Sequence, residues 1–505
     1  MLLLDLDRKS CVPLHRQLVK TIRERIDSGA LQPGEKLPST RQLAVSLGTH
    51  RTTVASAYQQ LWSLGYLDLR QRARPRVRRR TAVVSPADHQ QQWRLDWGKV
   101  ASPATEGILR DHREFPPPAG GPVDESTINL ATLDMDQRLF PLDQFRSCLN
   151  RASIRGGSEL LTCGDPAGYL PLREYLARRL RQHGIQVAAG ELLLTNGSQQ
   201  GIDLLFRLLA APGRAIAFEA PTYDYMLPLL RFYGMKPLAI PLRDDGMDLD
   251  FLERTLRHHR PSAIYTMPSF QNPTGISTTQ AHRERLLVLC EEHQTLLVED
   301  GYDEEMQYSG KVVLAVKSMD WHGLVAYCGT FSKVLFPGAR VGWIAADRDG
   351  IERLLAIRRF AEIAPSSLMQ AAISRFCRAG YFDRHVSKMH RTYRSRMQVA
   401  LQVLHEHIPP DLATWTEPRG GFLIWLRLQA ETAPAQELPR LLAKNGVRVG
   451  QGRFFFSGPE PQTCLRLSIA SLNEQEIDEG VRRLRRVLEE YVIRIRNTPC
   501  RGEAA

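Results

Sequence analysis

The first 65 residues of the chain show apolar side chains at helical spacing. Leu14, Leu18, Ile22 and Ile26 recur every four positions, and Gly29 follows them. This spacing predicts an amphipathic helix with one buried stripe, ended by a glycine that tolerates a positive φ.

Two shorter helices are expected next along the chain. Ser39 is followed three positions later by Gln42, which predicts a capping box at a helix start. Gly48 is expected to end that helix. The third helix ends at Gly65 and carries its apolar face on Val54, Tyr58, Leu61 and Leu64. Short helices around a glycine turn match a helix-turn-helix, and residues 66–69 with the stretch around Val77 are expected to form its wing.

Beyond residue 126 the pattern changes to helical stretches that alternate with short apolar strands. The strands are expected at residues 215–218, 263–267, 296–299 and 324–328. This alternation predicts an α/β fold with a largely parallel sheet. From about Tyr381 a long helix precedes strands near 422–428 and 464–469, which predicts a second, smaller α+β lobe.

The boundaries follow from these changes of pattern. Residues 81–126 lack sustained periodicity and contain three consecutive prolines and a Gly-Gly pair, which is typical of a linker. The expected segments are a winged helix-turn-helix at 1–80, the linker, a large lobe at 127–380, a small lobe at 381–490 and a tail at 491–505.

Charge is concentrated at the amino end. Of a net charge of +12, residues 1–80 hold 16 Lys and Arg against 6 Asp and Glu, an excess of ten. A solvated basic surface would explain a modest excess, but its concentration in one terminal block favours a polyanionic partner. The eight cysteines form no CxxC pair, so neither a zinc finger nor a dithiol centre is expected, and no metal site is predicted. Scattered thiols, acidic residues at the amino end and the absence of an 18-residue apolar run favour a cytoplasmic protein without a membrane span.

The amino-terminal block resembles the GntR-family winged helix across nearly its whole length. The segments GALQPGEKLPSTRQLA and RTTVASAYQQLWSLGYL carry the similarity. The resemblance implies binding to double-stranded DNA, with the third helix in the major groove. It makes Arg41 and Arg51 the principal contacts, supported by Thr52 and Thr53. The wing tip lacks the glycines usual in the family and carries added arginines, among them Arg72, which predicts strong phosphate binding and a steep dependence on salt.

Five later segments carry candidate chemistry. Each alone has an ordinary structural explanation: a helix start, a core tyrosine, an Asn-Pro turn, an acidic strand end, a surface lysine. The most specific of these motifs surrounds Lys333, which is preceded by Thr330 and Ser332 and followed seven positions later by Arg340. The segments are TNGSQQGIDLLFRLL at 195–209, PTYDY at 221–225, SFQNPTG at 269–275, LLVEDGYDEE at 296–305 and GTFSKVLFPGARVGW at 329–343.

In this order the segments resemble fold-type I enzymes of the aminotransferase class I/II family, which use pyridoxal 5'-phosphate (PLP), from about Ile128 to Val487. The resemblance implies that Lys333 holds PLP as an aldimine, while Asp300 pairs with the pyridine nitrogen. Asn272 and Tyr302 would hold the phenolic oxygen. The remaining implied contacts are ring stacking by Tyr223, phosphate binding by Gly197, Ser198, Gln199, Thr330, Ser332 and Arg340, and clamping of a carboxylate by Arg466.

Two positions depart from the family pattern. Cys163 stands where the family usually has a tyrosine that reaches the neighbouring subunit's phosphate. Gly301 replaces the second residue of an acidic pair that often follows the Asp300 strand. Neither change removes the amine chemistry of Lys333, but both put efficient turnover in question.

A GntR winged helix joined by a linker to an aminotransferase-like domain is the arrangement of MocR/GabR-type regulators. The favoured hypothesis is a homodimeric transcriptional regulator that senses an amino compound or PLP itself. An active PLP-dependent aminotransferase with a DNA-binding appendage is the alternative. A scaffold that binds no cofactor is the third hypothesis, which retention of the PLP residues disfavours.

Overall fold

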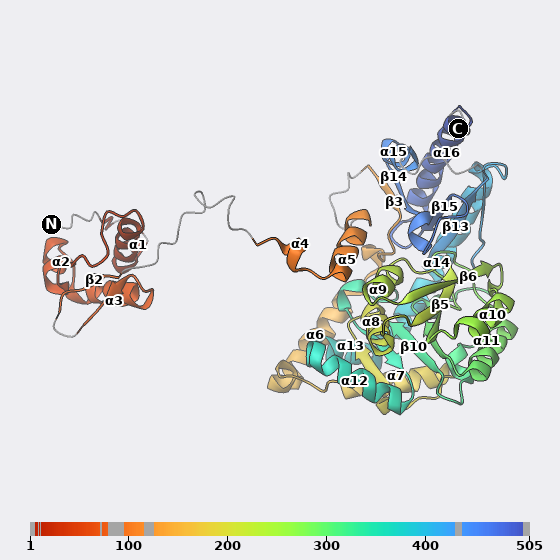
Figure 1. Cartoon of the computed structure of the whole chain (residues 1–505), viewed down its shortest axis with the longest axis horizontal. Coiled ribbons are helices and arrows are strands. Elements are labelled where there is room, and N and C mark those ends of the chain that lie inside the picture. The colour runs from red at the N-terminus through yellow and green to blue at the C-terminus, as the bar shows by residue number, and fades with distance from the viewer. Residues whose placement is uncertain are drawn as a thin grey trace. The chain divides into compact units, whose positions relative to one another are not determined.

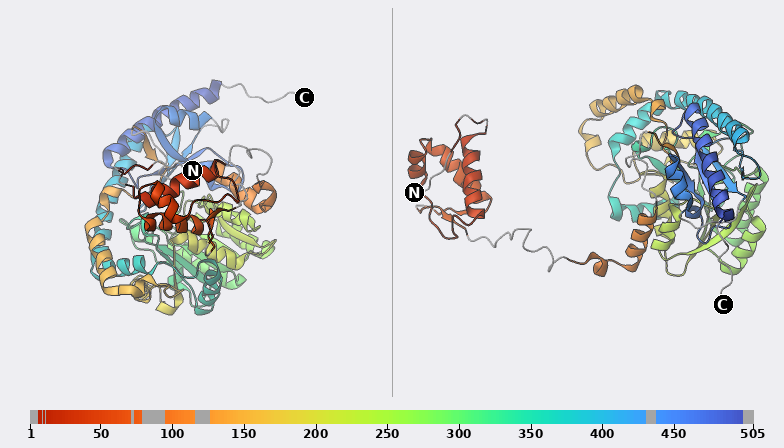
Figure 2. Two further views of the ribbon diagram at one scale, coloured as in Figure 1. Left: turned by 90° about the vertical axis from the view of Figure 1, so that its left-hand side faces the viewer. Right: turned by 90° about the horizontal axis from the view of Figure 1, so that it is seen from above.

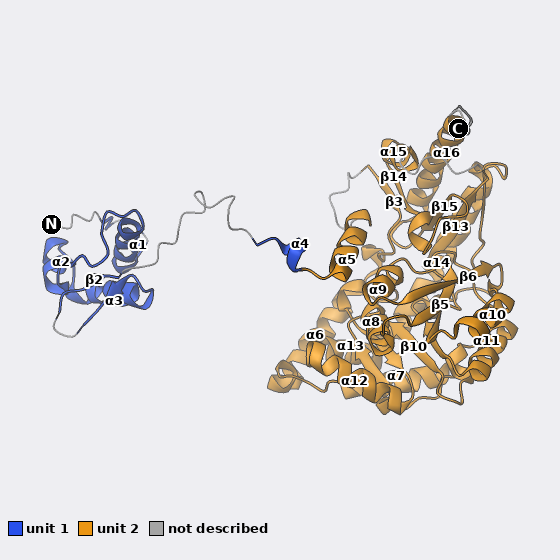
Figure 3. Cartoon of the chain, viewed as in Figure 1, with its two compact units in different colours: residues 1–100 blue, residues 101–505 orange. Residues whose placement is uncertain are grey.

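The computed structural model describes residues 6–8, 10, 12–70, 73–78, 95–115, 126–429 and 437–497. The chain divides into two compact units, residues 1–100 and residues 101–505 (Figure 3). Each unit contains buried apolar clusters of its own, so each is described by itself.

Residues 14–77 of the first unit form a three-helix winged fold. It comprises α1 (Leu14–Asp27), α2 (Thr40–Ser46), α3 (Arg51–Ser63) and an antiparallel ribbon of β1 (Leu67–Asp68) with β2 (Arg76–Val77). The predicted capping box is confirmed, because Gln42 N donates to Ser39 Oγ at 3.3 Å and Ser39 N donates to Gln42 Oε1 at 3.1 Å. The predicted apolar face of α3 is one residue too long: α3 ends at Ser63, and Leu64 beyond it is 47% exposed.

The described residues of the second unit contain an eight-stranded sheet in the order β4-β11-β10-β9-β8-β5-β6-β7. Its strands β5, β6 and β10 are labelled in Figure 1. Strands β10, β9, β8, β5 and β6 pair in parallel, whereas β4, β11 and β7 join through antiparallel pairs, so the prediction of a largely parallel sheet is confirmed. The strands are β4 (Leu192–Thr195), β5 (Ala215–Ala220), β6 (Lys236–Arg243), β7 (Gly246–Met247), β8 (Ala263–Thr266), β9 (Leu296–Asp300), β10 (Val325–Thr330) and β11 (Gly342–Ala345).

Helices cover both faces of this sheet because its central strands are apolar on both sides. Phe218, Tyr265 and Val298 pack toward one helix layer, and their neighbours Ala217, Ile264 and Leu297 pack toward the other. The first layer contains α8 (Ser198–Leu209), α9 (Met226–Phe232) and α12 (Arg348–Glu362). The second contains α6 (Leu142–Gly156), α7 (Leu170–Gln182), α10 (Leu249–His259), α11 (Gln280–His293) and α13 (Ser367–Arg378).

A smaller lobe is built on a second sheet in the order β12-β13-β15-β14-β3. Its elements are β12 (Ala413–Trp415), β13 (Leu423–Leu428), β14 (Val447–Gln451), β15 (Cys464–Ser468), α14 (Tyr381–His407), α15 (Glu437–Lys444) and α16 (Glu474–Asn497), the last shown in dark blue in Figure 2. Strand β3 (Ile128–Leu130) pairs in parallel with β14, so these residues belong to the small lobe and not to the predicted large lobe. A three-residue strand has too few positions to show which sheet it joins.

The segment predicted as a linker contains two helices, α4 (Trp97–Val100) and α5 (Pro103–Glu114). Helix α5 is held on α9 by an ion pair in which Arg231 Nη2 lies 2.8 Å from Asp111 Oδ1. Phe115, at the end of α5, packs on Tyr225 and Phe454 at ring-centroid distances of 5.8 and 5.0 Å. The apolar pattern did not reveal α5, because no residue of this helix is buried.

No helix of the described residues is long and apolar enough to cross a membrane. Short 3-10 turns connect several of the helices and strands. The turns are η1 (Gln137–Leu139), η2 (Gly157–Leu161), η3 (Ala189–Glu191), η4 (Glu304–Met306), η5 (Val316–Met319), η6 (Pro337–Ala339) and η7 (Gly452–Phe455).

Candidate functional site

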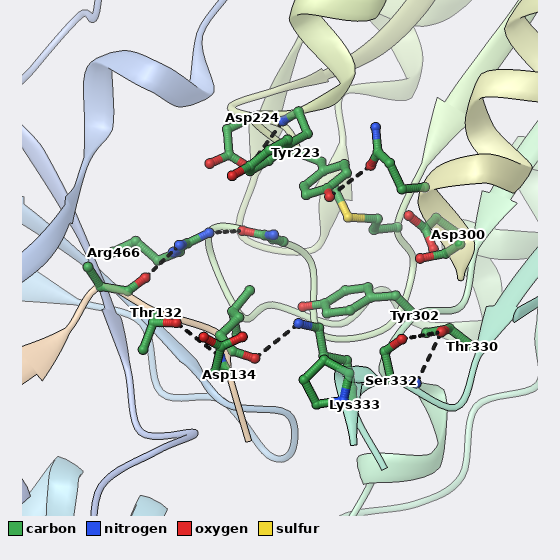
Figure 4. Close-up of a pocket in the computed structure, with 18 of the residues that line it drawn as sticks. Thr132, Asp134, Tyr223, Asp224, Asp300, Tyr302, Thr330, Ser332, Lys333 and Arg466 are labelled. Carbon is green, nitrogen blue, oxygen red and sulfur yellow. Dashed lines mark hydrogen bonds between the residues drawn. The ribbon is translucent and has the colours of Figure 1, made fainter. Parts of the chain in front are cut away.

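A cavity of about 360 Å³ lies at the carboxyl edge of the large sheet. Segments that follow β5, β8, β9 and β10 meet there because the carboxyl ends of parallel strands share one edge. Eleven of the twelve residues predicted for the cofactor and carboxylate line this cavity, most of them drawn in Figure 4: Ser198, Gln199, Tyr223, Asn272, Asp300, Tyr302, Thr330, Ser332, Lys333, Arg340 and Arg466. The twelfth, Gly197, directly precedes Ser198.

Lys333 supplies an amine at the floor of the cavity. Its Nζ donates to the backbone oxygen of Leu133 at 3.0 Å. Burial lowers the pKa of Lys333, although the nearby carboxylates of Asp134 and Asp303 act in the opposite direction. A lowered pKa increases the fraction of neutral amine, which is the form that attacks a carbonyl.

Asp300 ends β9 with one of its two oxygens paired. Tyr265 OH donates to Asp300 Oδ2 at 2.7 Å. Asp300 Oδ1 has no hydrogen-bond partner among the described residues, although the residue is only 3% exposed. Burial raises the pKa of Asp300 to about 6, against the hydrogen bond from Tyr265. A ligand that presents an N–H to Oδ1 would complete this pairing.

Backbone and cationic groups gather at one end of the cavity. Gly197 has φ +82° and precedes the amino end of α8, where unpaired backbone N–H groups favour an anion. Arg340 Nη2 donates to Asn196 O at 2.7 Å, which places the guanidinium beside the same turn. The hydroxyls of Thr330 and Ser332 lie 3.0 Å apart. This donor set suits a phosphate group.

Arg466 lies on β15 of the small lobe and lines the cavity from that side. Its Nη1 donates to Asn272 Oδ1 at 2.9 Å and its Nη2 donates to Ala131 O at 2.8 Å. Its Nε has no partner among the described residues, and the residue is 8% exposed. Nearby, Tyr302 OH donates to Phe270 O at 2.8 Å and Tyr223 OH donates to Gln199 Oε1 at 2.9 Å.

A buried ion pair positions the loop that follows β3. Asp136 accepts from Arg396 Nη2 at 2.6 Å and from Arg138 Nε at 2.7 Å. Burial acts to raise the pKa of Asp136, but these hydrogen bonds outweigh it and lower the pKa overall. Because Arg396 lies on α14, the pair ties the loop that carries Leu133 and Asp134 to the small-lobe framework.

The structure adds cavity residues that sequence motifs did not single out. These are chiefly Phe115, Asp134, Asp224, Tyr225 and Arg448. Asp224 and Tyr225 lie inside the PTYDY segment and could have been found there. The others come from remote parts of the chain that carry no motif.

The structure shows the surroundings of the two residues that depart from the family pattern. Cys163 is an exposed free thiol. A side chain at Gly301 would collide with the Tyr327 hydroxyl, which hydrogen-bonds to Glu304. Glycine at position 301 therefore makes room for the buried side chain of Tyr327.

The predicted DNA contacts lie around the helix-turn-helix. Arg41 on α2 is exposed, as are Arg51 and Thr52 at the start of α3, while Thr53 is partly exposed. Arg51 Nε donates to Thr40 Oγ1 at 3.4 Å, which links the starts of the two helices. Arg72 lies outside the described residues.

Comparison with known proteins agrees with both units. Residues 14–77 match the gntR family of bacterial regulatory proteins, and residues 126–484 match the aminotransferase class I and II family. The chain is 30% identical over 96% of its length to the probable rhizopine catabolism regulatory protein MocR of Rhizobium meliloti, of which it covers 95%. It is 30% identical over 94% of its length to the transcriptional regulator TauR of Rhodobacter capsulatus, of which it covers 96%.

Among solved structures, the chain resembles LysN, the α-aminoadipate aminotransferase of Thermus thermophilus complexed with N-(5'-phosphopyridoxyl)-L-leucine. The TM-score is 0.72 at 29% identity, over 79% of this chain and all of LysN. Fold and site thus define a winged-helix DNA-binding unit joined to an aminotransferase unit of fold type I. The chain belongs to the aminotransferase class I and II family, and it is a MocR-type regulator with a GntR helix-turn-helix.

The turn at Gly197 provides a test of the phosphate-binding end. A Cβ at position 197 would lie 2.8 Å from Arg340 Nη2, so Gly197→Ala is expected to weaken binding of inorganic phosphate, measured by calorimetry. Gly213→Ala is the matched control, because Gly213 has a similar φ of +81° but nothing within 4 Å of its Cβ position. Equal phosphate affinity in both variants would contradict this assignment.

Proposed function

We propose that this chain binds double-stranded DNA through α2 and α3 and binds PLP and an amino compound in the cavity, so that the cavity controls the action on DNA. The observation that carries the cofactor assignment is the unpaired Asp300 Oδ1, which lines the same cavity as the partly buried Lys333 amine. An unpaired buried carboxylate oxygen costs free energy unless a ligand donor meets it. The ring nitrogen of PLP is such a donor.

Each predicted residue has a distinct task in this proposal. Lys333 provides the amine that holds the cofactor aldehyde and moves a proton at the substrate carbon, and Asp300 keeps the ring nitrogen protonated. Asn272 and Tyr302 hold the phenolic oxygen, and Tyr223 stacks on the ring face. The phosphate is held by residues 197–199, Thr330, Ser332 and Arg340, and Arg466 binds the carboxylate of the amino compound. The cofactor, once bound, supplies an electron sink for reactions at the carbon bearing the amine.

A working aminotransferase is the second candidate. It is favoured by the joint presence of Lys333, Asp300 and Arg466 in one cavity, because these groups could hold PLP and an amino acid together and move the substrate proton once PLP is bound. A regulator and an aminotransferase would therefore share the first binding step and differ in whether product is released repeatedly. Fold alone does not decide between them.

Helix α5 provides a route from the cavity toward the DNA-binding unit. Phe115 lines the cavity, and α5 is the first helix of the second unit after the boundary at residue 100. A ligand that moves Phe115 would therefore move the segment through which the chain connects the two units. Such a ligand shifts the regulator only by its difference in affinity for the two states.

A homodimer is part of the proposal. Large apolar side chains are exposed on α6 and η2, where Ile154 is 80% and Leu161 is 77% exposed, and at the end of α12, where Phe360 is 90% exposed. A monomer would leave these side chains in water, and a second copy of the chain would cover them.

Substitution of these exposed apolar residues by aspartate tests the proposed dimer. The double variant Ile154→Asp with Leu161→Asp is expected to sediment as a monomer, because two carboxylates oppose burial of the α6 and η2 surface. Trp321→Asp, on another exposed apolar residue (82% exposed), is the control and should leave the dimer intact. A wild-type chain that sediments as a monomer with full PLP occupancy would contradict the proposal.

The central proposal is tested by the visible absorbance of the PLP-loaded chain during addition of amino compounds, with keto-acid product assayed in parallel. One spectral shift without accumulation of product indicates a sensor. Product in excess over protein indicates an aminotransferase. Lys333→Ala is expected to abolish the wild-type absorbance and its response to amines. An unchanged spectrum and response in that variant would exclude the assigned role of Lys333.

The DNA contact of Arg51 is tested by comparing operator DNA with random DNA. If Arg51 reads a base, Arg51→Ala should lower the preference for the operator by about 1–3 kcal/mol. Arg78→Ala is the control, because a wing arginine that contacts phosphate should weaken both DNAs alike and reduce the salt dependence. Equal losses on both DNAs for Arg51→Ala would show that Arg51 contacts phosphate only.

A further inference from the structure

Two carboxylates in the cavity have no task in the proposed chemistry. Asp300 is matched to the ring nitrogen of PLP, Arg340 to the phosphate and Arg466 to the carboxylate of the amino compound. Asp134 and Asp224 also line the cavity, and neither forms an ion pair with a cation of the described residues.

Asp134 is held in the cavity by the loop that follows β3. Its backbone N donates to Thr132 Oγ1 at 3.1 Å, and the Asp136 ion pair fixes the loop two residues further on. Its carboxylate acts to raise the pKa of the Lys333 amine, against the effect of burial. Figure 4 shows Asp134 on the same side of the cavity as Thr132, next to Lys333.

Asp224 enters the cavity from the segment after β5. Tyr225 N donates to Asp224 Oδ1 at 3.1 Å, and the carboxylate interacts electrostatically with Arg466 without forming an ion pair with it. In Figure 4 Asp224 lies beside Tyr223, across the cavity from Asp134.

Aromatic rings adjoin Asp224 in the cavity. Tyr223 and Tyr225 are stacked with ring centroids 5.8 Å apart and an interplanar angle of 28°, and Phe115 packs on Tyr225 from α5. Aromatic faces next to carboxylates attract an organic cation by both charge and cation–π interaction. Phe115, Tyr223 and Tyr225 line the same cavity as Asp134 and Asp224.

We infer that the amino compound sensed in the cavity is an amino acid whose side chain ends in a second cation, an ammonium or guanidinium group held by Asp134, Asp224 and the adjoining aromatic rings. The inference rests on the proposed function and specifies its ligand. The carboxylate of this ligand meets Arg466, whose Nε is buried without a partner, and its reacting amine meets the Lys333 end. Its second cation then neutralises carboxylates that nothing else in the described residues pairs.

Arg448 is the one feature of the cavity that favours the opposite ligand class. This arginine also lines the cavity and would attract a side-chain carboxylate, but it is exposed, whereas Asp134 and Asp224 are both partly buried. Partly buried charges interact with a ligand more strongly than exposed ones, because water screens them less. The two carboxylates therefore outweigh Arg448.

The test compares amino acids that differ at the side-chain end only. The full PLP-loaded chain is titrated with L-ornithine, L-lysine, L-arginine, uncharged L-norleucine and dicarboxylic L-2-aminoadipate, with the dissociation constant read from the cofactor absorbance and, independently, from calorimetry. At least one of the three basic amino acids is expected to bind about tenfold or more tightly than norleucine, and aminoadipate more weakly than norleucine.

Isosteric variants assign the preference to the two carboxylates. Asp134→Asn and Asp224→Asn should each reduce the preference for the basic amino acid over norleucine, measured as the ratio of the two dissociation constants, by about tenfold. Asp143→Asn removes an exposed charge on α6 and should change neither ligand, which controls for net charge. Preserved cofactor absorbance shows that each variant is folded.

The outcomes separate the inference from the proposed function. Tighter binding of norleucine or aminoadipate, or an undiminished preference in both Asn variants, overturns the cationic ligand while leaving an amino-compound sensor in place. A cofactor spectrum that responds to none of the five amino acids, nor to any other amine, overturns the sensor and the inference together.

Discussion

The parallel register of β5, β8, β9 and β10 is the constraint on which the rest of the site depends. Phe218 lies opposite Tyr265, Thr266 opposite Glu299, and Asp300 opposite Cys328, so the four strands end almost level. A slip of one residue would reverse the face of every side chain on the slipped strand. Asp300 would then no longer reach the cavity, and Tyr265 would no longer reach Asp300.

This strand arrangement buries the carboxylates of Glu219 and Asp300, and the protein satisfies their hydrogen-bonding capacity to different extents. Glu219 at the end of β5 is fully paired: it accepts from Thr266 Oγ1, from the backbone N of Met267 and from Gln271 Nε2. Asp300, close by, keeps one oxygen without a partner in the described residues. The same edge of the sheet therefore contains a structural carboxylate, satisfied by the protein, and one that a ligand would satisfy.

Membership of the aminotransferase class I and II family accounts for the cavity, and the gntR-family unit accounts for the classification of the chain as a regulator. Binding an amino compound uses the same lysine and arginine as converting it. In the shell around these residues, Phe115 at the end of α5 packs on Tyr225 from a segment that follows the DNA-binding unit in the chain.

Much of this molecule follows from local sequence. The four-residue period of α1, the Ser39–Gln42 capping box and the ordered segments around Asn272, Asp300 and Lys333 are short-range patterns, and their helices, strands and chemistry depend on neighbours within a few positions. The tertiary structure alone decided the partners of residues far apart in sequence. It placed β3 beside β14, put Phe115 in the lining of the cavity and brought Asp134 and Asp224 to two sides of that cavity. No local pattern encodes these contacts, because they join segments that lie at least 90 residues apart in the chain.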